Sequence, residues 1–239
     1  MKVRADLHNH SCLSPCGDLF MSPKTLVEGA LETGIKLIAL SDHNSAMNLP
    51  AMDKVCQSAG LPLIYGIEVT SLEEAHILCL FETLDIAMDM GELLYSLLPD
   101  IKNNPEKLGD QVWVDADENI EGEVEKYLGS GVNLSLDDLI IEVHRRGGLF
   151  IPAHIDRPMF SIPSQLGFLP PMDYDALEST VIPPPAFIGK IPKNIPLIQN
   201  SDAHYPENIG QRSTVYEMEE PGFQGLKMAL KAKLIEFHQ

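Results

Sequence analysis

The segment KVRADLHNH, residues 2–10, decides the fold class. It predicts a short β-strand over residues 2–5, followed directly by two histidines. On an extended chain, residues i and i+2 point to the same side, so His8 and His10 can reach one cation. A histidine pair of this kind is a weak signal alone, because a histidine at the end of a strand more often serves packing or capping.

Two distant segments repeat this arrangement of a histidine beside a carboxylate after an apolar run. They are SDHN at residues 41–44 and NSDAH at residues 200–204. Further histidines and carboxylates lie between them, and most occupy strand or strand-end positions. The candidate ligands for metal ions are His8, His10, Asp18, His43, Glu68, His76, His154, Asp202 and His204. Burying so many such groups around one opening would be costly without cations, which predicts a multinuclear metal site.

Strand-like and helix-like segments alternate along most of the chain. The predicted strands are 2–5, 35–40, 61–69, 75–81, 149–153, 174–180 and 196–199, and the predicted helices are 22–34, 50–60, 85–98, 135–147 and 222–233. Such alternation predicts a parallel sheet covered by helices, and about seven strands favour an α/β barrel or distorted barrel over an open sheet. Every candidate ligand except His76 lies at or after the carboxyl end of a strand, where α/β barrels carry their active sites.

The length of 239 residues predicts a single domain, residues 1–239, of barrel size. Residues 99–134 interrupt the alternation, because they are acidic and rich in turn residues and contain Trp113, the only tryptophan. We interpret them as an insertion with a β-hairpin. Its role stays open between a lid, an interface and a surface excursion.

A formal net charge of −18 argues against long nucleic acid as a partner. No apolar run has the length of a membrane span, and the first residues lack a signal-peptide core, so we expect no membrane association and a cytoplasmic location. Four cysteines lack zinc-finger spacing and are expected to be free thiols. A redox or soft-metal role for Cys12 and Cys16 remains the alternative. The residues predict no particular oligomeric state.

Taken together, the motifs resemble those of the PHP (polymerase and histidinol phosphatase) superfamily. The matching segments are DLHNHS at 6–11, SDHN at 41–44, GIEV at 66–69 with His76, PAHIDRP at 152–158 and NSDAH at 200–204. The resemblance implies a distorted (β/α)7 barrel with two or three divalent ions, zinc, manganese or iron, at the carboxyl face of the strands. It implies a first ion on His8, His10, Glu68 and Asp202, a second on Asp18, His43 and His204, and a third on His76 and His154 with Glu68 bridging.

We expect a phosphomonoesterase that hydrolyses a small phosphorylated metabolite, because clustered metals lower the pKa of bound water and supply a hydroxide. Arg157 would hold the phosphate, although a surface ion pair with Asp156 or a neighbouring acid is an equal alternative. The leaving group would be protonated by His204 or by a metal-bound water. Asp6 and Asp42 are candidates for orienting the imidazoles. The variants His10→Ala and Asp202→Asn are predicted to abolish hydrolysis and keep the fold.

Three other functions remain open. The first is a 3′–5′ exonuclease or phosphodiesterase that acts on nucleic acid or nucleotides. The second is a regulatory module that binds metal without turnover. The third is metal-dependent deamination or amide hydrolysis. The apolar, proline-rich segment 158–196, which includes Phe160, Phe168, Tyr174 and Phe187, is interpreted as packing or as the wall of a substrate pocket. His144 and His238 are assigned to the surface.

Overall fold

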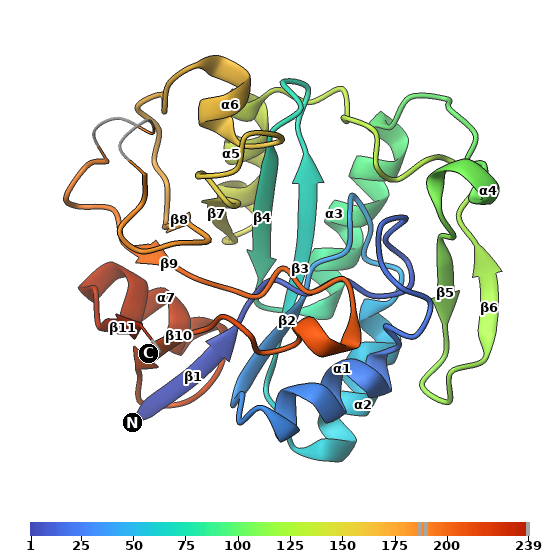
Figure 1. The fold of residues 1–239 in the computed structure, drawn as a ribbon, viewed down its shortest axis with the longest axis horizontal. Coiled ribbons are helices and arrows are strands. Elements are labelled where there is room, and N and C mark those ends of the chain that lie inside the picture. Colours follow the sequence, from blue (N-terminus) through green and yellow to red (C-terminus); the bar gives the residue numbers. More distant parts are fainter. Residues whose placement is uncertain (186–187, 189–190, 238–239) are drawn as a thin grey trace.

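The computed structural model describes residues 1–185, 188 and 191–237, and it has the mixed α/β architecture that the alternation predicts (Figure 1). Its elements are β1 (Lys2–Asp6), α1 (Pro23–Glu32), β2 (Leu37–Leu40), α2 (Leu49–Ala59), β3 (Leu63–Thr70), β4 (His76–Phe81), α3 (Leu84–Leu97), α4 (Pro105–Leu108), β5 (Val112–Val114), β6 (Ile120–Glu123), α5 (Leu136–Arg145), β7 (Leu149–Pro152), α6 (Ile162–Leu166), β8 (Leu177–Glu178), β9 (Leu197–Ile198), η2 (Pro206–Asn208), β10 (Thr214–Glu217), α7 (Phe223–Ala232) and β11 (Ile235–Phe237).

Seven strands form one sheet in the order β11-β10-β1-β2-β3-β4-β7. Strands β1, β2 and β3 are parallel, whereas β4 runs antiparallel to both β3 and β7. Strands β8 and β9 form a separate parallel pair. Hydrogen bonds from Asp175 to Phe150 and from Ile155 to Glu178 join this pair to β7. A bridge between Asn9 and Ala203 then joins the segments that follow β1 and β9. The strands therefore curl into a distorted barrel, which confirms the predicted fold class.

Side-chain alternation along the strands divides the core in two. Leu37 and Ala39 of β2 belong to one cluster with Ile64, Leu78 and Leu80, while the residues between them pack against the helices. Because side chains alternate between the faces of a strand, Glu68 shares the inner face with Ile64, and His76 shares it with Leu78. Two polar residues of strands β3 and β4 are thus directed into the barrel rather than toward its helices.

Helix boundaries follow the capping residues that the sequence predicts. The hydroxyl of Ser22 accepts a hydrogen bond from the amide of Thr25 at the start of α1, and Ser135 caps α5 in the same way through Asp138. Helix α2 ends at Gly60, whose φ of 67° lies in the left-handed region that favours glycine. Strands β10 and β11 and the short helices α4 and α6 were not predicted.

The segment 99–134 contains the expected antiparallel hairpin, formed by β5 and β6, and also the unpredicted helix α4. Its first strand is anchored beside the histidine segments, because the amide of Val114 donates to Asn48 Oδ1 at 2.9 Å and that of Val112 donates to the carbonyl of Cys12 at 3.2 Å. The description of the chain as one domain with an insertion here stays a prediction.

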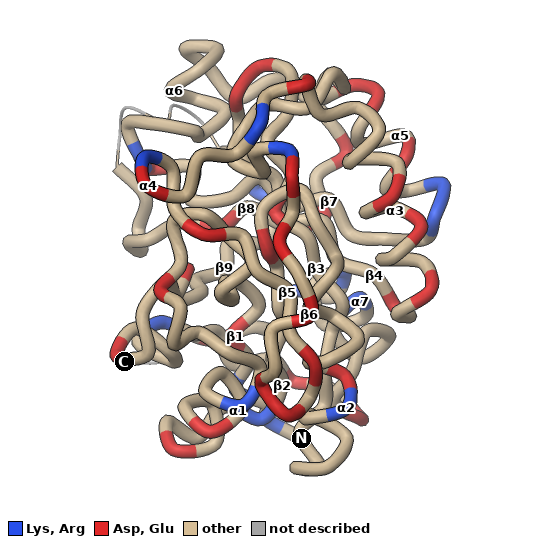
Figure 2. Tube along the Cα trace, turned by 90° about the vertical axis from the view of Figure 1, so that its right-hand side faces the viewer, with Lys and Arg blue, Asp and Glu red and all other residues tan. Residues whose placement is uncertain are grey.

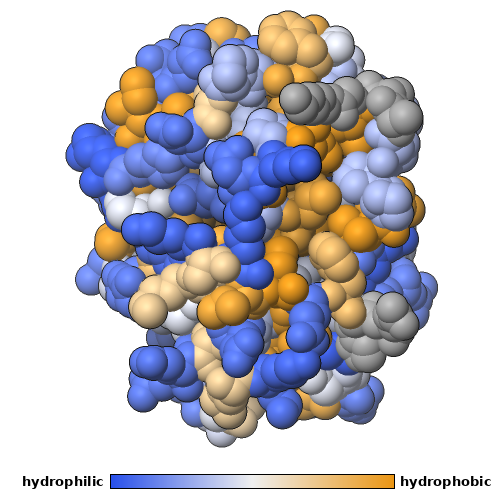
Figure 3. Space-filling view, turned by 90° about the vertical axis from the view of Figure 1, so that its left-hand side faces the viewer, coloured by the Kyte–Doolittle hydropathy of each residue, from blue (hydrophilic) through white to orange (hydrophobic). Residues whose placement is uncertain are grey.

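The exposed side chains differ in character between two opposite faces of the molecule. Asp and Glu predominate on the face that carries β5 and β6 (Figure 2), where Asp117, Glu121 and Glu123 are exposed. The opposite face, on the side of α6 and α7, exposes apolar side chains among hydrophilic ones (Figure 3), and Phe168 and Met228 are exposed hydrophobic residues. Among the residues described, no helix combines the length and the apolarity that crossing a membrane requires.

Candidate metal centre

The first histidine pair lies directly after β1, at the edge where three parallel strands end. His8 and His10 are fully buried, and their Nε2 atoms are 3.2 Å apart. The segment with His43 follows β2, and the main chains of His43 and Glu68 form a parallel bridge. Because the carboxyl ends of parallel strands meet at one edge, residues far apart in the sequence converge there.

His76 joins the same edge for a different reason. It is the first residue of β4, and β4 runs antiparallel to β3. The amino end of an antiparallel strand lies beside the carboxyl ends of its neighbours. The position that looked exceptional in the sequence is therefore equivalent in space to the others. His154 follows β7, which runs antiparallel to β4, and so reaches this edge as well.

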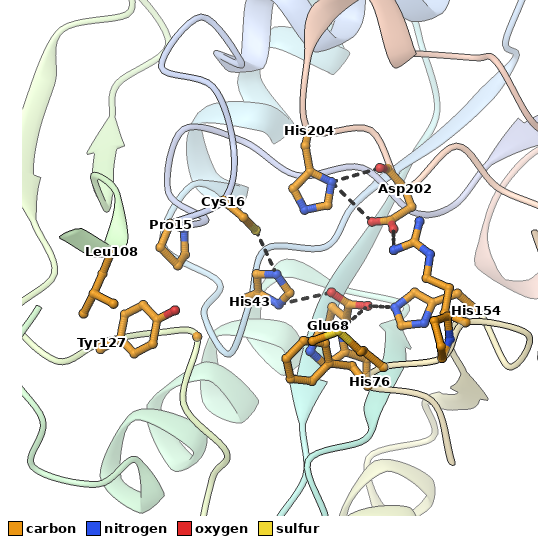
Figure 4. Close-up of a pocket in the computed structure, with 15 residues that line it drawn as sticks. Pro15, Cys16, His43, Glu68, His76, Leu108, Tyr127, His154, Asp202 and His204 are labelled. Carbon is orange, nitrogen blue, oxygen red and sulfur yellow. Dashed lines mark hydrogen bonds and ion pairs between the residues drawn. The ribbon is translucent and has the colours of Figure 1, made fainter. Parts of the chain in front are cut away.

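Glu68 lies at the centre of the cluster and contacts five imidazoles (Figure 4 shows three of them). Its carboxylate oxygens lie 3.1 Å from His8 Nε2, 3.4 Å from His10 Nε2, 3.1 Å from His43 Nδ1, 3.1 Å from His76 Nδ1 and 3.2 Å from His154 Nε2. One buried carboxylate among so many ring nitrogens is positioned to bridge more than one cation.

Asp202 faces the same group from the segment that follows β9. Its Oδ1 lies 3.3 Å from His8 Nε2 and 3.2 Å from His10 Nε2, and its Oδ2 lies 2.5 Å from Arg157 Nη1. Asp202 has a φ of 51° and His154 a φ of 30°, values in the left-handed region that are unfavourable for residues other than glycine. Such backbone strain concentrates at functional sites, because the surrounding structure must enforce it.

The electrostatics of the cluster show strong coupling between its charged groups. Burial raises the pKa of Glu68, but the neighbouring His76, His8 and His43 outweigh it and hold that pKa well below the usual value. Burial also opposes ionisation of His8, whereas Glu178 and Glu68 raise its pKa well above the ordinary value. Burial and the nearby His204 lower the pKa of His10 to about 4. The low pKa of Glu68 keeps a carboxylate ionised at the centre of the cluster, and the low pKa of His10 keeps one neighbouring imidazole neutral. Ionised carboxylates and neutral imidazoles are donors that divalent transition metals prefer, and a cation would take the place of the proton on His8.

Several buried atoms of the cluster have no hydrogen-bond partner among the described residues. They are Nδ1 of His43 and His154 and both carboxylate oxygens of Asp202, some of which have only the ion-pair contacts to Glu68, Arg157 and the histidines given above. Three groups of side chains have ligand atoms within 4.8 Å of one another, namely His10, His43 and His204; His8, His10 and Glu68; and His43, Glu68 and His76. Because unpaired buried polar atoms are costly, the arrangement fits cations held between these side chains.

Asp18 is the one candidate ligand whose side chain the structure does not bring to the cluster. Its carboxylate accepts a hydrogen bond from the amide of Phe20 at 2.8 Å, and it belongs to none of the three groups. Cys16 is present instead, with Sγ 3.2 Å from His43 Nε2. The side chains of the other eight candidates lie together in one cluster. Their role as metal ligands remains a prediction, and this arrangement supports it.

Glu178 is a site residue that the sequence analysis missed. Its buried carboxylate lies 3.0 Å and 3.1 Å from His8 Nδ1, accepts from Asn200 Nδ2 at 2.7 Å, and accepts from the amide of His154 at 2.9 Å. It thereby fixes the ring of His8 so that Nε2 faces Glu68. The available signal in the sequence was a carboxylate within the predicted strand 174–180. A carboxylate within a predicted strand is also what identified Glu68 as a candidate.

Asp6 and Asp42 support the site without touching an imidazole. The carboxylate of Asp6 accepts from the amides of Ser201 and Gly210 at 3.0 Å and 3.2 Å, which anchors the segment before Asp202. Asp42 accepts from the hydroxyl of Ser14 at 2.7 Å, and that hydroxyl lies 2.9 Å from His10 Nδ1. Asp42 therefore reaches the ring of His10 only through a serine.

Glu178→Gln is expected to lower metal affinity roughly 10- to 100-fold, the usual cost of losing a partner that orients a ligating histidine. The glutamine side chain has the same shape as Glu178, but its single oxygen cannot accept hydrogen bonds from His8, Asn200 and the main-chain amide of His154 at once. Competition with a chelating dye would measure the affinity, and Glu123→Gln, on the exposed hairpin, is the matched control. An unchanged affinity in Glu178→Gln would show that Glu178 does not orient His8.

A cavity of about 470 Å³ opens above the cluster, and Glu68, His76, His154, Asp202 and His204 line its floor. Phe160 stacks on His76 with a centroid distance of 4.7 Å. Leu108 and Tyr127 of the segment 99–134 form the opposite side (Figure 4). Of the predicted wall segment, Phe160 thus lines the cavity, Phe168 is exposed, Tyr174 is buried, and Phe187 lies outside the described residues.

Arg157 also lines the cavity, and 40% of its side chain is exposed. Its ion pair is with Asp202 rather than with Asp156, whose carboxylate instead accepts from the amide and hydroxyl of Thr180. Outside the cluster, His144 pairs with Asp175 at the surface, and His238 lies outside the described residues.

Comparison with known proteins identifies relatives of this arrangement. A family model described as the PHP domain matches residues 6–148. The DNA polymerase III PolC-type of Oceanobacillus iheyensis is 33% identical over 73 residues, which are 30% of this chain and 5% of that protein. The 5′-3′ exoribonuclease Rnm of Salmonella typhimurium is 34% identical over 73 residues, which are 30% of this chain and 24% of that protein. The matched segments are thus small parts of both relatives.

Solved structures share the fold over nearly the whole chain. The lesion-specific endonuclease PfuEndoQ from Pyrococcus furiosus superimposes with a TM-score of 0.68 at 19% identity, over 99% of this chain and 58% of that one. A complex of Endonuclease Q with a 27-mer duplex substrate, which has an abasic lesion at the active site, gives a TM-score of 0.64 at 20% identity, over 97% and 57%.

These findings contradict the prediction that the substrate is a small phosphorylated metabolite and that long nucleic acid is an unlikely partner. Endonuclease Q binds a duplex at the active site of the same fold, and the PolC-type polymerase and the exoribonuclease are nucleic-acid enzymes by name. The argument from a net charge of −18 failed because it summed charges over the whole surface. Local potential decides binding, and the carboxylates Glu68 and Asp202, which line the cavity, face imidazoles that partly offset their charge.

Proposed function

The chain belongs to the PHP domain family, and we propose that it hydrolyses phosphodiester bonds of nucleic acid, with one nucleotide held in the cavity above the histidine cluster. The family and its hydrolytic relatives make the chain a metal-dependent hydrolase. The observation that carries the proposal is the cavity itself, which places Arg157 and an aromatic wall over the group of potential metal ligands. Its volume of about 470 Å³ lies within the usual range for small-ligand sites.

Two or three divalent ions, zinc, manganese or iron, are proposed for the cluster. One would be held by His8, His10, Glu68 and Asp202, another by His43 and His204, and a third by His76 and His154 with Glu68 shared. Cations at these positions would polarise the phosphate and activate water for attack on phosphorus.

Arg157 is proposed to bind the phosphate that is cleaved. Its guanidinium now pairs with Asp202 Oδ2, so binding of a cation by Asp202 would release it toward the cavity. A planar guanidinium binds two phosphate oxygens at once, which fixes the orientation of the phosphate. The same arginine would thus neutralise Asp202 before a cation binds and hold the substrate afterwards.

His204 is assigned to a cation rather than to proton transfer. Its Nδ1 donates to the carbonyl of Asp202 at 2.9 Å, which leaves only Nε2 for another partner. A histidine that holds a cation through Nε2 cannot also donate a proton from that atom. Protonation of the leaving oxygen therefore falls to water in the cavity, which the exposure of the His204 side chain, 21%, admits.

The walls of the cavity suit a nucleobase. Phe160 and Tyr127 contribute aromatic side chains to its lining, and Met159 and Leu108 add apolar contact. Stacking on such side chains binds bases with little sequence preference. The acidic face with β5 and β6 (Figure 2) would repel the phosphate backbone, so the strand is proposed to leave the cavity away from the hairpin.

Arg157→Gln is expected to raise the KM for an oligonucleotide roughly 10- to 100-fold, from the 1.5–3 kcal/mol of a hydrogen bond to a charged group. The glutamine retains donors but loses the positive charge. Steady-state cleavage of a labelled oligonucleotide would give KM and kcat separately. Arg145→Gln, an exposed arginine on α5, is the matched control and should behave like the parent chain. Equal KM values for the two variants would remove Arg157 from phosphate binding.

The proposed function is tested with the full chain loaded with zinc, manganese or iron in separate samples. Labelled single-stranded DNA, single-stranded RNA and a duplex with one abasic site are the nucleic acids, and p-nitrophenyl phosphate is the monoester. We expect cleavage of at least one nucleic acid, abolished by a chelator, and slower turnover of the monoester. Hydrolysis of the monoester alone, or metal binding without any hydrolysis, would refute the proposal.

A further inference from the structure

We infer that the thiolate of Cys16, and not the carboxylate of Asp18, completes the cation site of His43 and His204. The inference rests on the proposed metal centre, and it changes the chemical character of one of its positions. A site of two imidazoles and a carboxylate becomes a site of two imidazoles and a thiolate.

The position of the thiol is the first observation. Cys16 Sγ lies 3.2 Å from His43 Nε2 and lines the cavity together with His43 and His204 (Figure 4). The ligand atoms of His43, His204 and His10 already lie within 4.8 Å of one another. His43 directs its other nitrogen, Nδ1, at Glu68, so its Nε2 is the atom that faces the thiol.

The loop that carries Cys16 explains why the thiol and not the carboxylate reaches the cavity. The amide of Gly17 donates to the carbonyl of Ser14 at 2.8 Å, which closes a tight turn with Cys16 inside it. A Cβ at Gly17 would lie 2.6 Å from the carbonyl oxygen of Ser11, so the turn depends on glycine there. The next residue, Asp18, is already committed, since its carboxylate binds the amide of Phe20 and its own amide binds the carbonyl of His204.

The buried atoms beside the thiol form the second, independent observation. Asp202 also lines this cavity, and apart from its ion pairs with Arg157, His8 and His10 its two buried carboxylate oxygens make no hydrogen bond to the described residues. Nδ1 of His43, which is also buried, lacks one as well. Buried polar atoms without hydrogen bonds in the lining of the cavity that Cys16 shares indicate that a ligand binds there.

The other cysteines lack these features. Cys12, Cys56 and Cys79 are buried, and Cys12 Sγ lies 3.8 Å from the carbonyl of Val112, whereas Cys16 is exposed. When a cation binds, the metal–sulfur bond forms and the thiol proton passes to solvent. A soft thiolate with imidazoles favours zinc or iron over manganese at this position.

Cobalt spectroscopy on the full chain tests the inference without any assay of activity. Cobalt(II) added to metal-free protein is expected to produce a thiolate-to-cobalt charge-transfer band in the near ultraviolet. Cys16→Ala should lose the band and bind zinc at least about tenfold more weakly, since even the loss of an outer partner of a ligand costs that much. Cys12→Ala, the matched control, and Asp18→Asn should keep both. Circular dichroism of each variant would verify its fold.

Three results would overturn the inference. They are bound cobalt without the band in the parent chain, a band that persists in Cys16→Ala, or a loss of bound cobalt in Asp18→Asn. The band is independent of the proposed function. A band without any cleavage of nucleic acid would refute the function and keep the thiolate ligand, whereas cleavage without the band would do the reverse.

Discussion

Asp202→Asn is expected to lower kcat/KM for the cleaved substrate by about 100- to 1,000-fold, as large as the loss of one charge-stabilising group in other hydrolases. Asp202 Oδ1 faces the Nε2 atoms of His8 and His10, and Oδ2 faces Arg157. An asparagine fits the same space but brings an amide donor and no charge. The cation shared with the two histidines would then be lost or displaced.

The measurement is steady-state cleavage at saturating metal, together with thermal unfolding of each variant. Asp53→Asn is the matched control, because Asp53 lies on α2 and binds the hydroxyl of Tyr65 away from the cavity. It should retain the activity of the parent chain. Turnover by metal-replete Asp202→Asn within a few-fold of the parent would remove Asp202 from the site. His10→Ala should be equally inactive, whereas His144→Ala should not.

Metal loading is expected to raise the Tm by roughly 8–16 °C. At a free concentration a thousandfold above Kd, binding to the native state alone stabilises it by about 4 kcal/mol, and each kcal/mol shifts Tm by about 2–4 °C at this size. The physical source is the cluster itself, in which the buried Glu68 and Asp202 carboxylates face several imidazoles and ring nitrogens of His43 and His154 make no hydrogen bond.

Thermal unfolding of chelator-treated and zinc-loaded protein would measure this shift. His10→Ala should lose most of the increase, because His10 belongs to two of the three ligand groups, and His144→Ala should keep it. A Tm that does not respond to zinc, manganese or iron would contradict the metal centre, whatever the activity. A shift without hydrolysis would instead support the regulatory alternative.

The sequence predicted most of the secondary structure because the strands that build the barrel carry clear local signals. The seven predicted strands correspond to β1, β2, β3, β4, β7, β8 and β9, and helices α1 and α5 begin at the serines that cap them. Strands β10 and β11 escaped prediction because they are short and extend the sheet beyond β1 by antiparallel pairing, whereas the strand–helix alternation predicts parallel strands.

Other features depended on contacts that no local pattern encodes. His76 looked misplaced until β4 proved antiparallel to its neighbours. Glu178 looked like an ordinary strand residue until its carboxylate was seen on His8. The prediction that long nucleic acid is an unlikely partner was wrong because the net charge does not describe how charge is distributed over the surface.

Residue types and their spacing along the chain determined the kind of chemistry, since histidines after strands attract cations wherever the strands come together. Which groups share a cation was decided only by the tertiary structure. The sequence favoured Asp18 as a ligand and Cys16, two residues earlier, as a free thiol, yet a turn at Gly17 directs the thiol toward His43 and the carboxylate toward Phe20. Coordination depends on distances of a few ångströms, and those distances arise from the packing of strands rather than from the order of residues.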